Sequence, residues 1–545
     1  MPPFIKRLKV NIKFFLVTNF FICSTGVFAQ HGNVSLLPYP AAITVKNETI
    51  AFEKTVKVYV ATNRFVDRSY WTEIFQQMGL EPQWQDRVSK AQVVFNIREV
   101  QGSKDDESYT LQIAPGKKRL IEATANSHRG ILYALQTLRQ LAKRSGSQIT
   151  FAACSISDRP TFSWRAFMLD ESRHFHGKET VKRLLDEMAR LKMNVFHWHL
   201  VDDPAWRLEI KKYPALTAIA SRGNFGHMMR LRDAPHRKDS LFRGQPAQFY
   251  TQDNIKEIIA YAHHRGIKVV PEIEVPGHAT ASIFAYPWLG ASSKEKGSGI
   301  HGDLYDVTDP KVEEFLQNVL DEVIALFPDG IVHIGGDEAD YGHWKSSKSI
   351  NDFMKKNAIP TYSDLQVWAI NRMSQYIAAK GYRMIGWNEI TGDNVREEAH
   401  IQEGSTEKLA KGTIVQFWDG KVSLVNKAIG QGYDVVNSDR HFTYLDYSYE
   451  TTPLTKAYAF NPVPEGIAAS DQKKILGLGC QMWGEYTPTT ERLYYQIFPR
   501  IAAFAEIGWV APSTKKNYAD FRKRLEPLEQ AWLNKGYIKE QSGKY

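Results

Sequence analysis

Cysteine is scarce in this sequence, whose 545 residues include only three. Cys23 lies in the N-terminal segment discussed below, so the rest of the chain holds Cys154 and Cys480 alone. Two cysteines cannot make the disulfide framework that stabilises small secreted domains, and we expect two buried free thiols. The chain must therefore rely on its hydrophobic core, and its length suffices for one large domain and a smaller one.

Long apolar runs are also absent beyond the first 30 residues. The one candidate, Phe14 to Cys23, is shorter than the roughly 20 residues that a membrane-spanning helix needs. It follows several basic residues and precedes Val27-Phe28-Ala29, which suits signal peptidase. We therefore predict a signal peptide over residues 1–29 and a secreted or periplasmic protein without a membrane span. An uncleaved anchor is the less favoured alternative, and the bulky Phe20-Phe21-Ile22 argues against lipidation of Cys23.

No Lys/Arg-rich block is present, and the positive charge is mild. Removing the signal peptide takes away Lys6, Arg7, Lys9 and Lys13 and no acidic residue, so the formal net charge falls from +9 to +5. This balance does not indicate nucleic-acid binding. His-x-x-x-His and Cys-x-x-Cys spacings are missing as well, so we expect neither a metal nor a cofactor.

Residues 30–155 have the pattern of a small α+β domain. Strands are expected at Thr55–Val60, Gln92–Ile97, Ser108–Ile113 and Leu120–Thr124. One helix is expected from Ser127 to Arg144, where apolar residues recur at helical spacing. This region has no cluster of residues typical of a catalytic site.

From about residue 156 to 510, after the break at Asp158-Arg-Pro160, strands alternate with helices. Eight strand candidates begin near Ala166, Asn194, Lys268, Ile331, Tyr382, Thr413, Asp434 and Ile475. Helices are expected at Val181–Leu191, Asn254–His264, Val312–Phe327, Leu365–Lys380, Val422–Ile429 and Thr490–Ile507. Eight such units favour an α/β fold, a closed (β/α)₈ TIM barrel, over an open sheet. The long connection from Asp203 to Gln252 is expected on its C-terminal face, and residues 511–545 as a helical extension packed on the barrel.

The fourth strand candidate, Ile331-Val-His-Ile-Gly-Gly-Asp-Glu338, ends in two adjacent carboxylates. Catalytic residues of barrels gather at the C-terminal ends of strands. Neighbours within a strand point to opposite faces, but Gly335 and Gly336 can relax the pleat so that Asp337 and Glu338 reach one pocket. Two converging carboxyls suit acid/base cleavage of a glycosidic bond. The alternative is an Asp-Glu turn that opens a helix.

Polar and aromatic residues also follow the other predicted strands. The segments are Asp170–His174, His197–Asp203, Glu272–His278, Trp387–Glu389, Trp418–Asp419, Asp439 and Trp483–Glu485. Three of them carry a tryptophan where a late strand ends: Trp387, Trp418 and Trp483. Because indole faces stack on sugar rings, the three predict an aromatic-walled carbohydrate pocket.

Together these motifs resemble the β-N-acetylhexosaminidases of glycoside hydrolase family 20. The resemblance covers about residues 160–510, and the family usually carries a similar α+β module before its barrel. It rests, in chain order, on Trp164–Phe175, Asn194–Asp203, Pro276–His278, His333–Glu338, Tyr444–Asp446 and Met482–Tyr486. One departure is Glu272-Ile-Glu274-Val-Pro276, where the family more often has Phe, Asp and Thr within the motif.

The resemblance implies exo-acting hydrolysis of a glycan with a terminal N-acetylhexosamine (GlcNAc or GalNAc), whose own acetamido group is the nucleophile. Glu338 would be the general acid and base, Asp337 would stabilise the acetamido nitrogen, and Tyr444 would orient its carbonyl oxygen. The resemblance also implies that the acetamido group is enclosed by Trp387, Trp418 and Trp483. The sugar hydroxyls far from the cleaved bond would be bound by Arg165, Asp446 and Glu485. Glu338 would be positioned by Asp202 and His278.

Three alternatives remain at this point. The protein could be a barrel glycosidase that uses two of its own carboxylates, such as Glu338 with Glu389. It could be a non-catalytic carbohydrate-binding relative, against which the intact Asp337, Glu338 and Tyr444 argue. A metal-dependent amidohydrolase ranks last.

Overall fold

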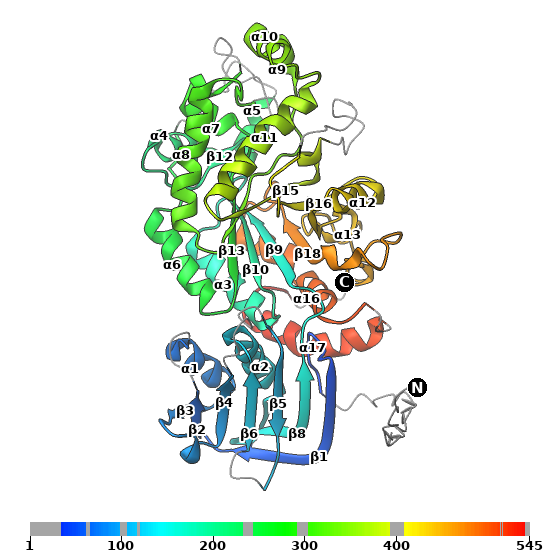
Figure 1. Cartoon of the computed structure of the whole chain (residues 1–545). Coiled ribbons are helices and arrows are strands. Elements are labelled where there is room, and N and C mark those ends of the chain that lie inside the picture. The colour runs from blue at the N-terminus through cyan, green and yellow to red at the C-terminus, as the bar shows by residue number, and fades with distance from the viewer. Residues whose placement is uncertain are drawn as a thin grey trace, which may run out of the picture. The chain divides into compact units, whose positions relative to one another are not determined.

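The computed structural model describes residues 34–61, 66–98, 106–116, 120–232, 244–291, 304–392, 408–512, 514 and 516–539 (Figure 1). The predicted signal peptide lies outside these ranges. Within them, no helix is both long and apolar enough to cross a membrane. Cys154 and Cys480 are both buried and unbonded, which confirms the expectation of free thiols.

The N-terminal region is one mixed sheet with two helices against it (Figure 1). Its strands are β1 (Ala42–Phe52), β2 (Thr55–Val60), β3 (Glu81–Trp84), β4 (Val93–Ile97), β5 (Tyr109–Ile113), β6 (Ile121–Ala125), β7 (Lys143–Ser145) and β8 (Gln148–Asp158). Their order is β1-β8-β5-β6-β4-β2-β3, with β7 on β8. The four predicted strands and the predicted helix, α2 (His128–Leu141), are all present.

The expectation of a single helix in this region is wrong, because α1 (Arg68–Gln77) is a second one. It begins at Asp67, whose side chain accepts a hydrogen bond from the Ser69 backbone N–H. Its apolar residues Trp71 and Phe75 are buried against the sheet. Such a short helix has little periodicity to recognise and is stabilised mainly by this packing.

The second region is a closed barrel of eight parallel strands, as predicted. The strands are β9 (Trp164–Asp170), β10 (Val195–His199), β13 (Lys268–Glu272), β14 (Ile331–His333), β15 (Arg383–Trp387), β16 (Ile414–Phe417), β17 (Asp434–Asn437) and β18 (Ile475–Met482). β18 pairs with β9 and so closes the ring. An apolar cluster with a member from nearly every strand fills part of the interior: Trp164, Ala166, Val195, Val270, Ile331, Ile385, Ile414 and Val436.

Helices surround the barrel (Figure 1). The main ones are α3 (Lys178–Arg190), α6 (Gln252–His263), α8 (Pro310–Leu326), α11 (Tyr362–Ala379), α12 (Val422–Gly430), α15 (Thr490–Ile497) and α16 (Arg500–Trp509). The prediction of one helix over Thr490–Ile507 is wrong, because it is divided into α15 and α16. Pro499 has no N–H to donate and restricts Phe498 to a non-helical conformation, so the helix ends there.

Shorter elements lie in the connections. After β10 come β11 (Val201–Asp202), β12 (Ala205–Trp206), α4 (Ala215–Ala218) and α5 (Phe225–Arg232). The others are α7 (Thr280–Ala285), α9 (Gly342–Ser346), α10 (Lys348–Lys356), α13 (Arg440–Thr443) and α14 (Leu454–Ala459). Finally, α17 (Tyr518–Asn534) packs on the barrel helices, where Trp532 Nε1 donates to Glu187 Oε2 at 2.8 Å.

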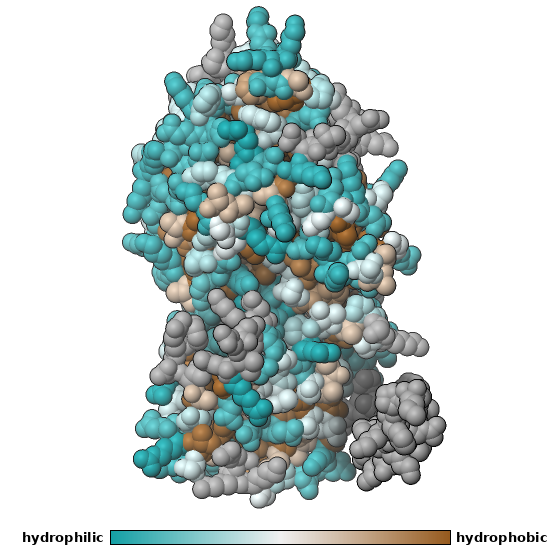
Figure 2. Space-filling view, viewed as in Figure 1, coloured by the Kyte–Doolittle hydropathy of each residue, from teal (hydrophilic) through white to brown (hydrophobic). Residues whose placement is uncertain are grey.

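Apolar side chains are concentrated in two large buried clusters, one around the barrel and one in the N-terminal sheet. On the face drawn in Figure 2, the remaining hydrophobic residues are scattered among hydrophilic ones. A loss of buried packing is therefore the expected route by which core substitutions unfold this protein.

Candidate active site

The loop after β14 brings Asp337 and Glu338 to one imidazole. His278 Nε2 lies 3.7 Å from Asp337 Oδ2 and 3.9 Å from Glu338 Oε2. Gly335, Gly336 and Glu338 all have positive φ, so the chain turns sharply between the strand and the carboxylates. A Cβ at Gly335 would lie 1.6 Å from Glu274 Oε2, and one at Gly336 would lie 2.5 Å from Ile390 Cγ2. Only glycine fits at these two positions.

His278 connects these carboxylates to a second acidic pair. Its Nδ1 lies 3.1 Å from Asp203 Oδ2 and 3.4 Å from Asp202 Oδ1. Burial by itself would lower the pKa of His278, but the Asp202 carboxylate and hydrogen bonds to Asp203 and Asp337 raise it well above its ordinary value. The imidazole is therefore cationic at neutral pH and can orient the Glu338 carboxylate by electrostatic attraction.

An aromatic wall stands beside the two carboxylates. Trp387, Trp418 and Tyr444 form one buried cluster, against which Trp483 and Tyr447 pack. The rings of Trp418 and Tyr444 are nearly parallel at a centroid distance of 6.2 Å, and Trp387 lies 5.8 Å from Trp483. Burial raises the pKa of Tyr444 well above its ordinary value, so its hydroxyl remains a neutral donor.

Carboxyl groups orient two of the indoles, one from a buried and one from a partly buried glutamate. Trp418 Nε1 donates to Glu389 Oε2 at 2.8 Å, and Trp387 Nε1 donates to Glu272 Oε1 at the same distance. Burial, together with the charges of Asp337 and Glu338, raises the pKa of Glu389 well above its usual range. Glu389 is therefore a neutral partner of Trp418 and a poor nucleophile.

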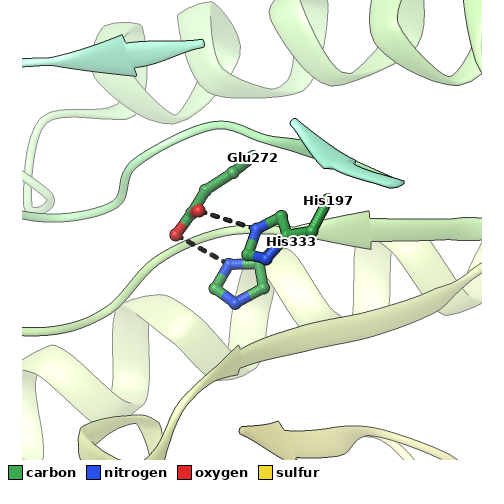
Figure 3. A group of neighbouring side chains, drawn as sticks. All are labelled: His197, Glu272 and His333. Carbon is green, nitrogen blue, oxygen red and sulfur yellow. Dashed lines mark ion pairs between the residues drawn. The ribbon is translucent and has the colours of Figure 1, made fainter. Parts of the chain in front are cut away.

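Glu272, which accepts the hydrogen bond from Trp387, lies between two histidines (Figure 3). Its carboxylate oxygens are 2.7 Å from His197 Nε2 and 2.9 Å from His333 Nδ1. The residue types suit a metal, and similar groups in the described ranges are His199 with Asp202 and Glu274, Asp202 with Asp203 and His278, and His278 with Asp337 and Glu338. However, His197 Nε2 and His333 Nδ1 are each already at hydrogen-bond distance from a Glu272 oxygen, and the two rings are stacked at 4.5 Å with 25° between their planes. This geometry favours a hydrogen-bonded support for Trp387 over a metal site.

The polar end of the site is built around Arg173, three residues beyond β9. Its guanidinium pairs with Asp202 at 2.6 Å and Asp170 at 3.2 Å, and stacks over Trp483 at 5.1 Å. Glu485 Oε1 is 3.9 Å away. A cavity of about 220 Å³ opens here, lined by Arg173, Asp202, Asp203, Pro204, Phe225, Met228, Asp446, Glu485 and Tyr486. Asp446 Oδ1, which is buried, has no hydrogen-bond partner among the described residues.

The prediction that Arg165 grips the sugar is wrong. Arg165 is the second residue of β9, at the opposite end of the barrel from Asp337, and its side chain is fully buried. It pairs with Glu107 at 2.8 Å and donates to the hydroxyl of Tyr133, both in the N-terminal region. Arg173, and not Arg165, lines the cavity at the polar end of the site. Strand direction could have identified Arg173, because it follows the C-terminal end of the same strand.

The structure brings the other predicted site residues together around the loop after β14. Trp387, Trp418, Tyr444 and Trp483 form the wall, Asp446 and Glu485 line the cavity, and Asp202 and His278 stand behind Asp337 and Glu338. The sequence did not predict that Glu272 and Glu274 hydrogen-bond to the histidines and tryptophan of the site, although their position at the end of a strand indicated a role there. A closed parallel barrel with paired carboxylates, an aromatic wall and a polar cavity at its C-terminal end defines a barrel glycoside hydrolase.

Comparison with known proteins identifies the family. The model of the glycosyl hydrolase family 20 catalytic domain matches residues 162–512, and that of the family 20 domain 2 matches residues 33–159. The chain belongs to glycosyl hydrolase family 20, which confirms the predicted resemblance.

Similar proteins include a β-hexosaminidase of Porphyromonas gingivalis, 36% identical over 444 residues, and one of Vibrio furnissii, 33% identical over 495 residues. The matches cover 77% and 87% of this chain, and 53% and 76% of those proteins, so the chain spans about half of the first. A crystal structure of an exo β-N-acetylglucosaminidase from Vibrio harveyi with N-acetylglucosamine superposes with a TM-score of 0.79 at 29% identity, covering 93% of this chain and 78% of that one.

Proposed function

We propose that this protein is an exo-acting β-N-acetylhexosaminidase that removes terminal β-linked GlcNAc or GalNAc from glycans. The supporting observation is Asp337 Oδ1, a buried carboxylate oxygen without a hydrogen-bond partner in the described structure, beside an aromatic wall. A buried acceptor of this kind needs a donor to offset its desolvation. The N–H of a 2-acetamido group, whose methyl packs on indoles, supplies one.

In the proposed reaction the substrate carries its own nucleophile. Glu338 gives its proton to the glycosidic oxygen, and the acetamido carbonyl oxygen attacks the anomeric carbon as the bond to the leaving group breaks. The product is a cyclic oxazolinium ion, whose positive charge Asp337 stabilises while Tyr444 holds the carbonyl oxygen. Glu338 then removes a proton from water, which opens the ring with net retention of configuration.

Glu389 argues for this mechanism over one that uses two protein carboxylates. It is the partly buried carboxyl group named above as the alternative nucleophile, yet the Trp418 indole donates to it and its raised pKa favours the neutral form. A neutral, hydrogen-bonded acid cannot attack the anomeric carbon effectively.

The exo mode follows from the polar end of the pocket. Arg173, Asp446 and Glu485 surround the place where the hydroxyls remote from Glu338 would lie. A sugar hydroxyl both donates and accepts hydrogen bonds. Carboxylates can accept from it, and the guanidinium or a protonated carboxyl can donate to it. They would close around the terminal sugar, with the leaving group on the Glu338 side.

Two substrates test the proposal: a 4-nitrophenyl N-acetyl-β-glucosaminide and the matching β-glucoside without the acetamido group. We expect hydrolysis of the first only, and equal rates on both would contradict substrate assistance. Asp337→Ala should lower kcat by at least about 100-fold, because it removes a preorganised electrostatic contact. The matched control is Asp340→Ala, whose exposed side chain lies three residues away and should leave kcat unchanged.

We further propose that residues 1–29 direct export to the periplasm or the exterior. N-terminal sequencing of the protein recovered from outside the cytoplasm should begin at Gln30.

A further inference from the structure

A third carboxyl group, that of Glu274, lies against the loop that carries Asp337. Glu274 follows β13 by two residues, and its side chain is buried. Its Oε1 lies 3.2 Å from His199 Nε2. Its Oε2 has no hydrogen-bond partner in the described ranges, and it faces Gly335, where any side chain would collide with it.

The surroundings of Glu274 do not require its negative charge. The ionisable groups that face it from the elements packed around it are His199, Asp202, Glu272, His278, Tyr305 and Asp337. His199, the nearest cation, already has Asp170 at 3.3 Å, Asp202 at 3.5 Å and Glu272 at 3.9 Å. His199 therefore shares its charge among four carboxylates and does not neutralise Glu274 alone, so a proton on one of these acids would relieve their repulsion.

Glu274 is the acid best placed to hold that proton. Burial raises its pKa well above the ordinary value, and the charges of Asp337 and Glu272 raise it further. Asp337 Oδ1 is likewise buried and unpartnered within the described residues. Two like charges do not both form readily in one buried site, so a proton on Glu274 relieves its repulsion with the Asp337 carboxylate.

We propose that Glu274 is a positioning residue whose protonated carboxyl keeps Asp337 as the single anion directed at the acetamido group. This inference rests on the proposed function. It also gives the departure in the Glu272-Ile-Glu274 motif a physical meaning: a glutamate reaches one methylene further than an aspartate, which brings its carboxyl under Gly335. The proton belongs on Oε2, because the His199 N–H occupies Oε1.

The proposal predicts a particular pH dependence. Loss of the Glu274 proton at alkaline pH would place a second negative charge beside Asp337 and weaken its orientation. The alkaline limb of kcat/KM should therefore contain this ionisation in addition to the one set by the general acid. Glu274→Gln, which is neutral at every pH, should retain kcat within about threefold near neutrality and lose only the part of that limb that Glu274 contributes.

Two further variants complete the experiment. Glu274→Asp withdraws the carboxyl by one methylene and should lower kcat about tenfold with little change in KM, since it disturbs a group that acts in the transition state. The matched control is Glu171→Gln, which alters another buried glutamate with an unpartnered oxygen at a strand end, away from Asp337. Its alkaline limb should coincide with that of the wild type.

The outcomes separate the two proposals. An alkaline limb of Glu274→Gln that coincides with the wild type, or a loss above about 100-fold at every pH, would overturn the inference, because the ionised form would then be the active one. If the Gln variant does not fold, wild-type kcat in Glu274→Asp would overturn it. The proposed function is tested separately by the wild-type protein on the N-acetylated substrate and by Asp337→Ala.

Discussion

Asp337 and Glu338 are adjacent in the chain but differ in access to solvent. The Asp337 side chain is 9% exposed and that of Glu338 is 25% exposed. A residue that passes a proton to a leaving group and later takes one from water must reach solvent, whereas one that stabilises a charge benefits from a dry site. The proposed division of roles between the two residues is therefore consistent with their difference in burial.

Glu338→Gln tests whether Glu338 is the general acid. The variant cannot protonate the leaving oxygen, so kcat should fall by about 100-fold or more with a poor leaving group. With a leaving group as acidic as 2,4-dinitrophenol, which departs unprotonated, the loss in the first step should be small. Steady-state and burst kinetics on a series of aryl glycosides provide the measurement, and a uniform loss across the series would count against the acid role.

Arg173 and Arg165 offer a matched pair on one strand. Arg173→Met should lower kcat/KM by about 100-fold or more, because it removes the proposed charged contact to the sugar and leaves Asp202 without its closest cation. Arg165→Met should instead lower the free energy of unfolding by about 1–3 kcal/mol, because the buried Glu107 Oε2 loses its cation and only Oε1 keeps a charged partner, Arg129, with kcat preserved in the folded fraction. Denaturant titration and kinetics on both variants distinguish these effects. A large loss of kcat/KM in Arg165→Met and none in Arg173→Met would show that Arg165 is the residue that acts in the site.

At the scale of elements, the loop after β14 depends on Gly335. Gly335→Ala should abolish measurable activity, because its methyl group would displace Glu274 and shift Asp337. Gly330→Ala is the control, since Gly330 also has positive φ but nothing lies within 4 Å of its Cβ position. It should cost only the backbone strain of about 1 kcal/mol and leave kcat unchanged, as thermal unfolding and kinetics would record.

The elements that sequence reasoning predicted share a strong local signal. The barrel strands are mainly β-branched or apolar runs followed by polar or aromatic residues. This local pattern can be recognised without knowing the tertiary contacts. α1 and the break at Pro499 were missed because a ten-residue helix and a single proline are weak signals inside longer patterns. Arg165 was misassigned because its role depends on which end of β9 it occupies and on Glu107, which is distant in sequence. The partners of Glu274 are likewise set by the closed barrel and could not be read from spacing.

At the scale of the whole molecule, buried acids make stability depend on pH. Burial raises the pKa of Glu171 from 4.5 to about 7. Between these values the unfolded chain releases a proton that the folded protein retains, so stability falls as pH rises from about 4.5 to 7 and then levels off, by about 3 kcal/mol in total. Glu171→Gln removes this penalty and should raise the melting temperature at pH 8 but not at pH 4. Equal shifts at both values would show that Glu171 is ionised throughout.

The contacts of Arg165 have a consequence for attempts to shorten the protein. A chain that starts at residue 160 would keep every residue of the catalytic cavity. It would also strip Arg165 of Glu107 and Lys192 of Asp158, the latter pair being 3.0 Å apart. Both cations would then lose their nearest carboxylates at a newly exposed end of the barrel, so such a fragment should be recovered insoluble even though the residues it lacks do not line the cavity.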